Sequence, residues 1–171
     1  MFFTDLHVQT LARGIMQPGE QLQGQTVTRY RPFWAMGLIR RMHLVLATNQ
    51  RIVICEHRAG LLGGPRLHAI DAVAWGQVQE AKVTGLLKKK LKVAGQGDRG
   101  PVALKAEIPK DFMGFFGPMK NNLQGARAVA STYEQAKGGA LPAAAVPGQL
   151  PASYPPPAQS GFPAAPHQHV A

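Results

Sequence analysis

Hydrophobic and polar residues alternate along much of this chain in short runs that are typical of β-strands. The clearest case is segment 42–55, where two runs rich in Val, Ile and Leu flank the polar tetrad Thr48-Asn49-Gln50-Arg51. A polar break of this length is typical of a hairpin turn. The segment therefore predicts two antiparallel strands in the core of a β fold.

Other strand-length segments follow the same pattern, and glycines or prolines separate them. The predicted strands are 20–30, 67–75, 78–84, 88–93 and 102–108, and the predicted breaks are 60–65, Gly85, 95–100 and Pro109. Short strands with turn signals at this spacing indicate a small barrel or sandwich.

Helical spacing of apolar residues is found near both ends of this strand-rich region. Leu6, Leu11 and Ile15 recur at approximately helical intervals after a capping Thr4 or Asp5, and Pro18-Gly19 ends the helix. Residues 118–137 predict a second amphipathic helix, although Gly125 lowers its intrinsic helix propensity. We predict a mainly β (α+β) fold: a seven-stranded antiparallel barrel or sandwich, capped by a C-terminal helix, with a short N-terminal helix.

The C-terminal segment 138–171 differs in composition from the rest. It contains no Lys, Arg, Asp or Glu, and 8 of the 14 prolines lie in its 34 residues. Such a composition buries too little apolar surface to offset the entropy of ordering, so we predict a disordered tail. Its Tyr154-Pro155-Pro156-Pro157 run suits a polyproline II ligand, but a plain spacer is the commoner role of such tails.

The charge of the chain lies entirely outside this tail. All 19 basic and 9 acidic residues fall in positions 1–137, which therefore carry the whole net charge of +10. A basic domain of this size suggests an anionic partner, either a phospholipid surface or nucleic acid.

No combination of residues predicts an enzyme. The nine carboxylates are scattered singly, the six histidines lack metal-ligand spacing, and neither glycine-rich segment has the Lys and hydroxyl residue of a phosphate-binding loop. The single cysteine, Cys55, falls in a predicted strand and is expected to be a buried apolar residue. We predict no catalytic residue, no metal and no cofactor.

The beginning of the chain lacks a signal-peptide pattern, and no apolar stretch reaches the length of a membrane span. We expect a cytoplasmic protein that touches a membrane only at its periphery.

Several motifs, taken in order, resemble the bacterial pleckstrin-homology-like (PH-like) domain family. They are Pro18-Gly19-Glu20, the T-[DN]-x-R turn at 48–51, the I-x-x-V segment at 70–73 and the GLL-x-x-x-L segment at 85–91, and the resemblance spans residues 18–137. It implies seven strands closed by one helix. The chain departs from the family pattern at the long apolar loop 32–41 and at the Phe-rich link 111–116. Members of this family form rings, so the resemblance permits self-assembly.

The loop between the first two predicted strands combines cations with large apolar side chains. Its cations are Arg29, Arg31, Arg40 and Arg41, and its apolar residues are Phe33, Trp34, Met36, Leu38 and Ile39. In eukaryotic proteins of the PH fold, this loop supplies basic side chains to phosphoinositide headgroups, but the K-x(n)-K/R-x-R spacing of those proteins is absent here. Core packing of the apolar residues and an interaction surface for a protein or a lipid are equally compatible with the pattern.

A second basic candidate is the row Lys88, Lys90 and Lys92, whose alternation places the side chains on one face of a strand. Lys82 is expected across the hairpin from it. The row can attract phosphates, although a solvated face that discourages edge pairing is the commoner role. Nucleic acid is the less favoured anion, because the aromatic residues lie apart from the lysines.

We therefore predict a helical arm at 1–19, a PH-like domain at 20–137 and a tail at 138–171. The expected function is that of a non-enzymatic binding or assembly module, associated with an anionic membrane or with a protein partner. The alternative is a homo-oligomeric scaffold that binds no lipid.

Overall fold

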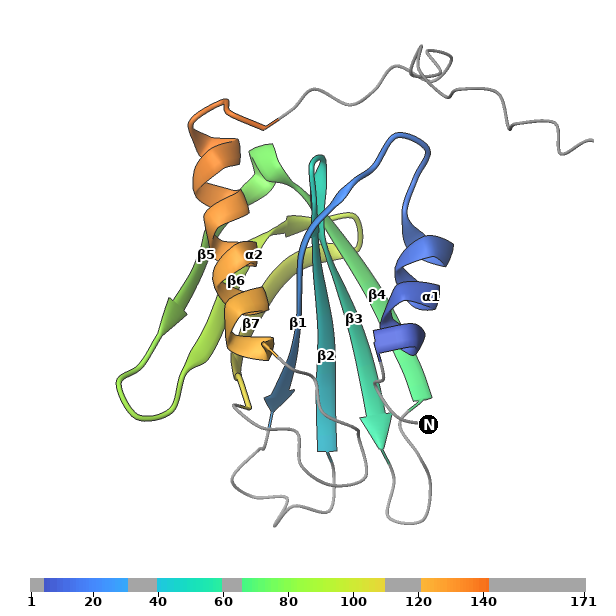
Figure 1. Cartoon of the computed structure of the whole chain (residues 1–171), viewed down its shortest axis with the longest axis vertical. Coiled ribbons are helices and arrows are strands. Elements are labelled where there is room, and N and C mark those ends of the chain that lie inside the picture. Colours follow the sequence, from blue (N-terminus) through green and yellow to red (C-terminus); the bar gives the residue numbers. More distant parts are fainter. Residues whose placement is uncertain (1–4, 31–39, 60–65, 110–120, 142–171) are drawn as a thin grey trace, which may run out of the picture.

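The computed structural model describes residues 5–30, 40–59, 66–109 and 121–141. These ranges contain seven β-strands, two α-helices and one short 3-10 helix (Figure 1). In chain order the elements are α1 (Asp5–Ile15), β1 (Leu22–Tyr30), β2 (Arg40–Thr48), β3 (Arg51–Ala59), β4 (Arg66–Ala74), η2 (Trp75–Gln77), β5 (Val78–Thr84), β6 (Lys90–Gly97), β7 (Gly100–Glu107) and α2 (Asn122–Lys137). The predicted fold class, mainly β with a helix near each end, is confirmed.

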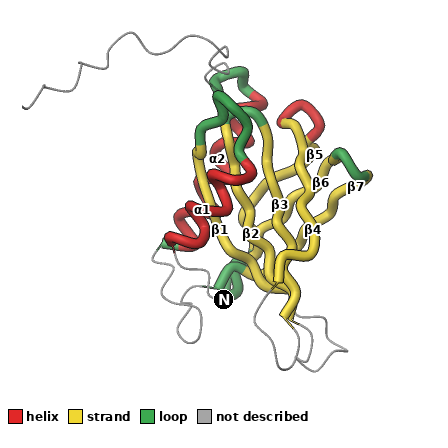
Figure 2. The backbone as a smooth tube through the Cα atoms, turned by 90° about the vertical axis from the view of Figure 1, so that its right-hand side faces the viewer, coloured by secondary structure: helices red, strands yellow, loops and turns green. Residues whose placement is uncertain are grey.

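The described strands form one antiparallel sheet in the order β4-β3-β2-β1-β7-β6-β5. β1 pairs with β2 along its length, but it pairs with β7 only through Arg29 and Glu107. The sheet therefore turns at this point into two halves, β4 to β1 and β7 to β5, which face each other across a shared core (Figure 2).

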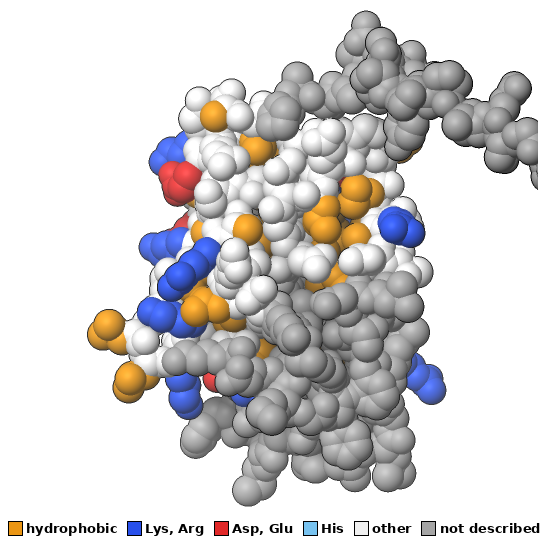
Figure 3. Space-filling view, in the orientation of Figure 1, with side chains coloured by type: hydrophobic (Ala, Val, Ile, Leu, Met, Phe, Trp, Pro, Cys, Tyr) orange, Lys and Arg blue, Asp and Glu red, His pale blue; other side chains and the backbone are white. Residues whose placement is uncertain are grey.

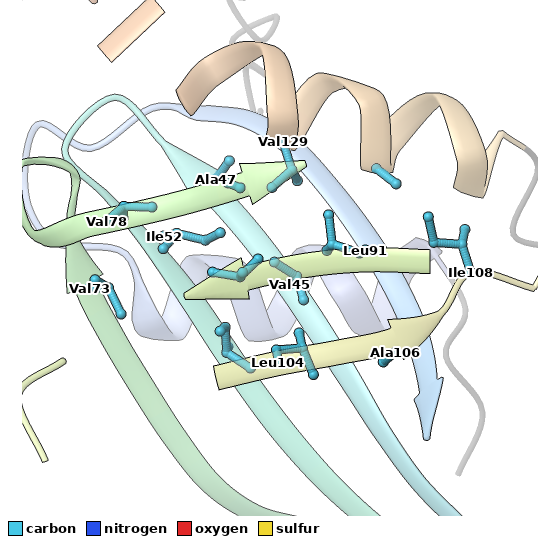
Figure 4. Close-up of a cluster of buried hydrophobic side chains, with 14 residues drawn as sticks. Val45, Ala47, Ile52, Val73, Val78, Leu91, Leu104, Ala106, Ile108 and Val129 are labelled. Carbon is cyan, nitrogen blue, oxygen red and sulfur yellow. The ribbon is translucent and has the colours of Figure 1, made fainter. Parts of the chain in front are cut away.

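Apolar side chains from both halves meet in this inner core (Figure 4). Val45 and Ile52 come from the first half, Leu91 and Leu104 come from the second, and Val129 comes from α2. α2 contacts both β1 and β5, so it covers the space where these two strands do not pair.

The contact between α2 and β1 depends on two residues of the helix. A Cβ on Gly125 would lie 1.9 Å from the carbonyl oxygen of Gln25, so only glycine allows this approach. The buried Asn122 side chain accepts a hydrogen bond from Val27 N at 2.8 Å and donates one to Val27 O at 2.9 Å. The amide of Asn122 thus makes the two hydrogen bonds to Val27 that a neighbouring strand would make, at a position where β1 does not pair with β7.

A second core lies on the outer face of the first half-sheet, beneath α1 (Figure 2). Val8 and Ala12 of α1 pack there with Val27, Leu44 and Cys55 of the strands. β2 and β3 are therefore buried on both faces, which explains why their sequences read as nearly continuous apolar runs. Cys55 is fully buried, as predicted.

The β2–β3 turn is joined to the segment between α1 and β1 by a buried ion pair. Arg51 Nε lies 2.7 Å and Nη2 3.2 Å from the two carboxylate oxygens of Glu20, whose side chain is fully buried. Arg51 also donates to the carbonyl oxygen of Ile15 at the end of α1. The motifs at 18–20 and 48–51 are thus two parts of one contact that holds α1 against the sheet.

One predicted turn is wrong in its extent. The glycine-rich segment 95–100 was expected to lie wholly between strands, but β6 continues to Gly97 and the turn consists of Asp98 and Arg99. Gly95 is a close-contact residue within β6, because a Cβ there would lie 2.6 Å from the carbonyl oxygen of Gln77.

The predicted link 111–116 and nearly all of the predicted tail lie outside the described residues. α2 ends at Lys137, at the predicted boundary of the tail. Within the described ranges, neither helix has the length and apolar character needed to cross a membrane.

Candidate functional site

Three lysines lie side by side across the outer face of the second half-sheet. Lys82 of β5 is paired with Lys92 of β6, and Lys92 is paired with Lys105 of β7. Their strand neighbours Ala81, Leu91 and Leu104 are buried, so the lysines point outward. Figure 3 shows Lys and Arg side chains gathered along this side of the molecule.

Glu80 partly neutralises this row. Its carboxylate lies 2.6 Å from Lys82 Nζ and also contacts Lys92 Nζ. Hydrogen bonds from Lys82 and Lys92 hold the pKa of Glu80 below its usual value, so the carboxylate is ionised at neutral pH. Among the described residues, Lys105 has no carboxylate within ion-pair distance.

A second row of charges runs parallel to the first. Lys90 of β6 is paired with Glu107 of β7, and Glu107 is paired with Arg29 of β1, whose Nη2 lies 3.6 Å from Glu107 Oε1. We call the two rows together the basic face, which consists of Arg29, Lys82, Lys90, Lys92 and Lys105, with the carboxylates Glu80 and Glu107.

Beyond the basic face, the β5–β6 hairpin projects from the rest of the molecule at the lower left of Figure 1. Its turn carries Leu86 and Leu87, which are 93% and 90% exposed. We call these two leucines the apolar tip. Figure 3 shows hydrophobic side chains protruding at this corner, next to the Lys and Arg side chains.

The basic face contains only some of the predicted anion-binding residues. Arg29, Lys90 and Lys92 belong to it. Lys88 lies in the turn before β6, so the predicted strand alternation applies only to Lys90 and Lys92. Arg40 is the first residue of β2.

The apolar loop that was predicted as an interaction surface lies outside the described residues. This holds for Arg31 and for the apolar residues Phe33, Trp34, Met36, Leu38 and Ile39. Their roles stay predictions.

Arg41 lies apart from the basic face, on the inner side of the first half-sheet. Arg41 Nε is 3.9 Å from Glu56 Oε1, and Arg58 Nε is 2.7 Å from the same oxygen. Burial tends to raise the pKa of Glu56, but the hydrogen bond and charge of Arg58, with the charges of His43 and Arg41, lower it overall. Burial lowers the pKa of His43, and the charges of Arg41 and His57 lower it further against the opposing effect of Glu56. Arg41 is thus already engaged by a carboxylate.

The described residues hold no cluster of three or more His, Cys, Asp or Glu side chains that could ligate a metal. Burial raises the pKa of the Cys55 thiol to about 11, which leaves the sulfur protonated and unreactive at neutral pH.

Sequence reasoning missed Lys105 and the apolar tip. The signal for the tip was present as Gly85-Leu86-Leu87-Lys88, between the predicted strands 78–84 and 88–93, but its leucines were interpreted only as part of a family motif. Lys105 was missed because its position opposite Lys92 depends on the register of the β6–β7 hairpin, which is not visible in the pattern of one strand.

Comparisons with known proteins identify no family. No family model matches the chain, and no curated protein sequence matches it. Among solved structures, the hSac2 domain from the human phosphoinositide phosphatase Sac2 is similar over 78% of this chain and 81% of that chain, with 8% identity and a TM-score of 0.48. A likeness of this degree carries no argument about function, and the resemblance to the bacterial PH-like family stays a prediction.

Proposed function

We propose that this protein is a non-enzymatic binding module that associates with the surface of anionic membranes through its basic face. The observation that carries the proposal is the row Lys82, Lys92 and Lys105. Like charges directly opposite one another destabilise a sheet, and Glu80 offsets this repulsion only for Lys82 and Lys92, so the Lys92–Lys105 pair is left uncompensated among the described residues. An anionic surface would relieve the repulsion.

Protection of a sheet edge does not account for the row. Lysines on an edge strand discourage pairing with other chains, and β5 is such a strand. β6 and β7, however, are interior strands, so the same explanation fails for Lys92 and Lys105. Attraction to a flat anionic surface favours cations spread over adjacent strands.

The test is co-sedimentation of the full chain with vesicles of phosphatidylcholine alone and with vesicles that also contain phosphatidylserine, across a salt series. We expect binding only to the anionic vesicles, and we expect it to weaken as salt screens the charges. Absence of salt-sensitive binding would overturn the proposal.

A variant in which Lys82, Lys92 and Lys105 are all changed to Gln assigns the binding to the basic face. Each lysine near an anionic membrane contributes about 1 kcal/mol, so the partition coefficient should fall by about 100-fold. The matched control changes Arg66, Arg127 and Lys137 to Gln, which removes the same charge from exposed positions on β4 and at α2. An equal loss in both variants would show that total charge, and not the basic face, governs binding.

A second candidate function is self-assembly through the edge strand β4. Leu67 is 45% exposed and pairs with His57 of β3, and Ile70 is 37% exposed and pairs with Cys55. Cys55 belongs to the outer core, and the register shift between the two pairs leaves both β4 side chains on this outer face. An edge with exposed apolar side chains suits pairing with a second copy. Light scattering of the wild type and of an I70K variant tests this: the candidate requires an oligomer that the substitution dissociates, and a monomeric wild type would exclude it.

A further inference from the structure

The apolar tip is held outward by the shape of its turn. Gly85 has a φ of +93°, and a Cβ at this position would lie 2.2 Å from the carbonyl oxygen of Lys88. The turn therefore requires glycine, and it places Leu86 and Leu87 at its apex. The base of the turn is fixed by a 2.8 Å hydrogen bond from Ile108 N to the carbonyl oxygen of Lys89. The leucines are therefore exposed because the conformation of the turn is fixed.

Neither core of the protein uses these two leucines. Leu86 and Leu87 take no part in the inner or the outer core. Two adjacent leucines that are 93% and 90% exposed leave nearly their whole side chains in water. Their transfer to an apolar phase would be favourable, since the hydrophobic effect scales with the apolar area removed from water.

The charges around the tip indicate which apolar phase it meets. Lys88, Lys89 and Lys90 follow directly in the sequence, and Lys82 and Lys92 lie at the next level of the hairpin. Residues two apart on a strand differ in height by about 7 Å, so Lys90 and then the Lys82–Lys92 pair lie at successive levels behind the leucines, on one face of the hairpin. Apolar side chains at the acyl boundary with cations at the level of lipid phosphates are the usual arrangement of a surface-bound membrane anchor.

We infer that the β5–β6 hairpin inserts Leu86 and Leu87 into the interface of an anionic bilayer, with Lys88, Lys90 and the basic face against the lipid headgroups. The inference rests on the proposed membrane association. It adds which part of the protein enters the bilayer and how the protein is oriented on it. The hairpin enters the bilayer tip first, and the β6–β7 turn at Asp98 and Arg99, at the other end of β6, stays in water.

The first experiment places an environment-sensitive fluorophore on the tip of the full chain through an L87C substitution. Cys55 need not be removed, because it is fully buried and its thiol pKa is about 11. The control carries the same label through Q96C, an exposed position on the same strand, β6, near its opposite end. Binding to anionic vesicles should shift the emission of the label at 87 to the blue, and lipids brominated in the acyl chain should quench it. The emission of the label at 96 should neither shift to the blue nor be quenched.

Vesicle sedimentation in the same samples separates this inference from the proposed function. If the protein sediments with anionic vesicles while the label at 87 stays aqueous, tip insertion is wrong and the basic face alone binds. If the label responds equally at 87 and 96, the orientation is wrong. If the protein does not sediment at all, both the proposed function and the inference fail.

A second variant does not depend on labelling. L86S/L87S should lower the partition coefficient on the order of 100-fold, because most of the transferred apolar area is lost. The loss should persist at high salt, where binding through lysines is screened. Urea unfolding of this variant should match the wild type, since neither leucine is buried. Unchanged partitioning at high salt would overturn the inference.

Discussion

Single side chains decide how α2 and the sheet are joined, and Asn122 is the clearest case. It is 3% exposed, and besides its two bonds to Val27 it accepts from Thr26 Oγ1 at 2.8 Å and donates to Pro109 O at 3.1 Å. An asparagine side chain can make both kinds of bond because its amide carries a donor and an acceptor. No aliphatic or carboxylate side chain can satisfy both polar groups of Val27.

We predict that N122A lowers the free energy of unfolding by about 3 kcal/mol, because buried polar groups of Val27 and Pro109 lose their partners. N122D should be at least as harmful at neutral pH, since a carboxylate cannot donate to the two carbonyl oxygens. Urea unfolding measures both, and Q124A on the exposed side of α2 is the control. A wild-type unfolding midpoint for N122A would contradict this account of the α2–β1 contact.

A second residue-scale prediction concerns pH. The pKa of His43 is lowered from 6.5, chiefly by burial, so the unfolded chain binds a proton at a pH where the folded chain does not. The contribution of His43 to stability is complete above pH 6.5 and is lost as the pH falls from 6.5 through the folded pKa. Urea unfolding at a series of pH values should show this decline, and an NMR titration should place the His43 pKa below that of an exposed histidine. A His43 pKa at or above 6.5 would reverse the sign and refute the prediction.

At the scale of elements, the two helices have different relations to the sheet. α2 closes the space between β1 and β5 and requires close backbone contact at Gly125. α1 covers the outer face of the first half-sheet through side chains, with no comparable restriction at Gly14, where a Cβ would meet nothing within 4 Å. Glycine is therefore required by packing at position 125 of α2, whereas at position 14 of α1 it only lowers the helix propensity.

We predict that G125A destabilises the protein by roughly 2 kcal/mol or more, because the clash with Gln25 outweighs the higher helix propensity of alanine. The matched control, G14A, should stabilise it by up to about 1 kcal/mol, since alanine lowers the entropy lost on helix formation and meets no neighbour. Thermal and urea unfolding of the two variants give the comparison. A shift of the same sign in both would mean that propensity, and not packing, governs α2.

At the scale of the whole molecule, the basic face and the apolar tip lie together at one side of the described structure. Apart from Arg29 of β1, the basic face lies on the second half-sheet, which α1 does not cover, and the apolar tip extends from the β5–β6 hairpin of this half-sheet (Figure 3). Within the described part of the chain, Glu80 and Glu107 are the carboxylates that form ion pairs with the cations of this face. The electrostatic attraction of the molecule for an anionic surface thus depends on how far these two carboxylates neutralise it.

We predict that E80Q strengthens binding to anionic vesicles about fivefold, because Lys82 and Lys92 lose the carboxylate that they share. The control E134Q changes the net charge equally at an exposed position on α2 and should leave binding nearly unchanged. Vesicle sedimentation at low salt measures both variants. Weaker binding of E80Q would mean that Glu80 holds the lysines in the geometry that binds lipid.

The local pattern of this chain was sufficient to predict which segments form its α-helices and β-strands, although not the bounds of β6. Strand-length segments between turn signals predicted β5 at its observed bounds and the β2–β3 hairpin around Thr48 to Arg51, because strand periodicity and turn chemistry act over only a few residues. The same locality predicted that Lys90 and Lys92 share a face and that Cys55 is buried.

What only the tertiary structure decided are the contacts between residues distant in the sequence. Gly125 lowers the helix propensity of α2, but the close approach of α2 to Gln25 of β1 requires a glycine at this position. Glu20 meets Arg51, Asn122 meets Val27, and Lys105 joins Lys82 and Lys92 through register. The exposure of Leu86 and Leu87 belongs to the same class, because burial depends on what the rest of the chain places nearby. Periodicity reports which face a residue occupies, whereas its partner on that face is set by the packing of the whole molecule.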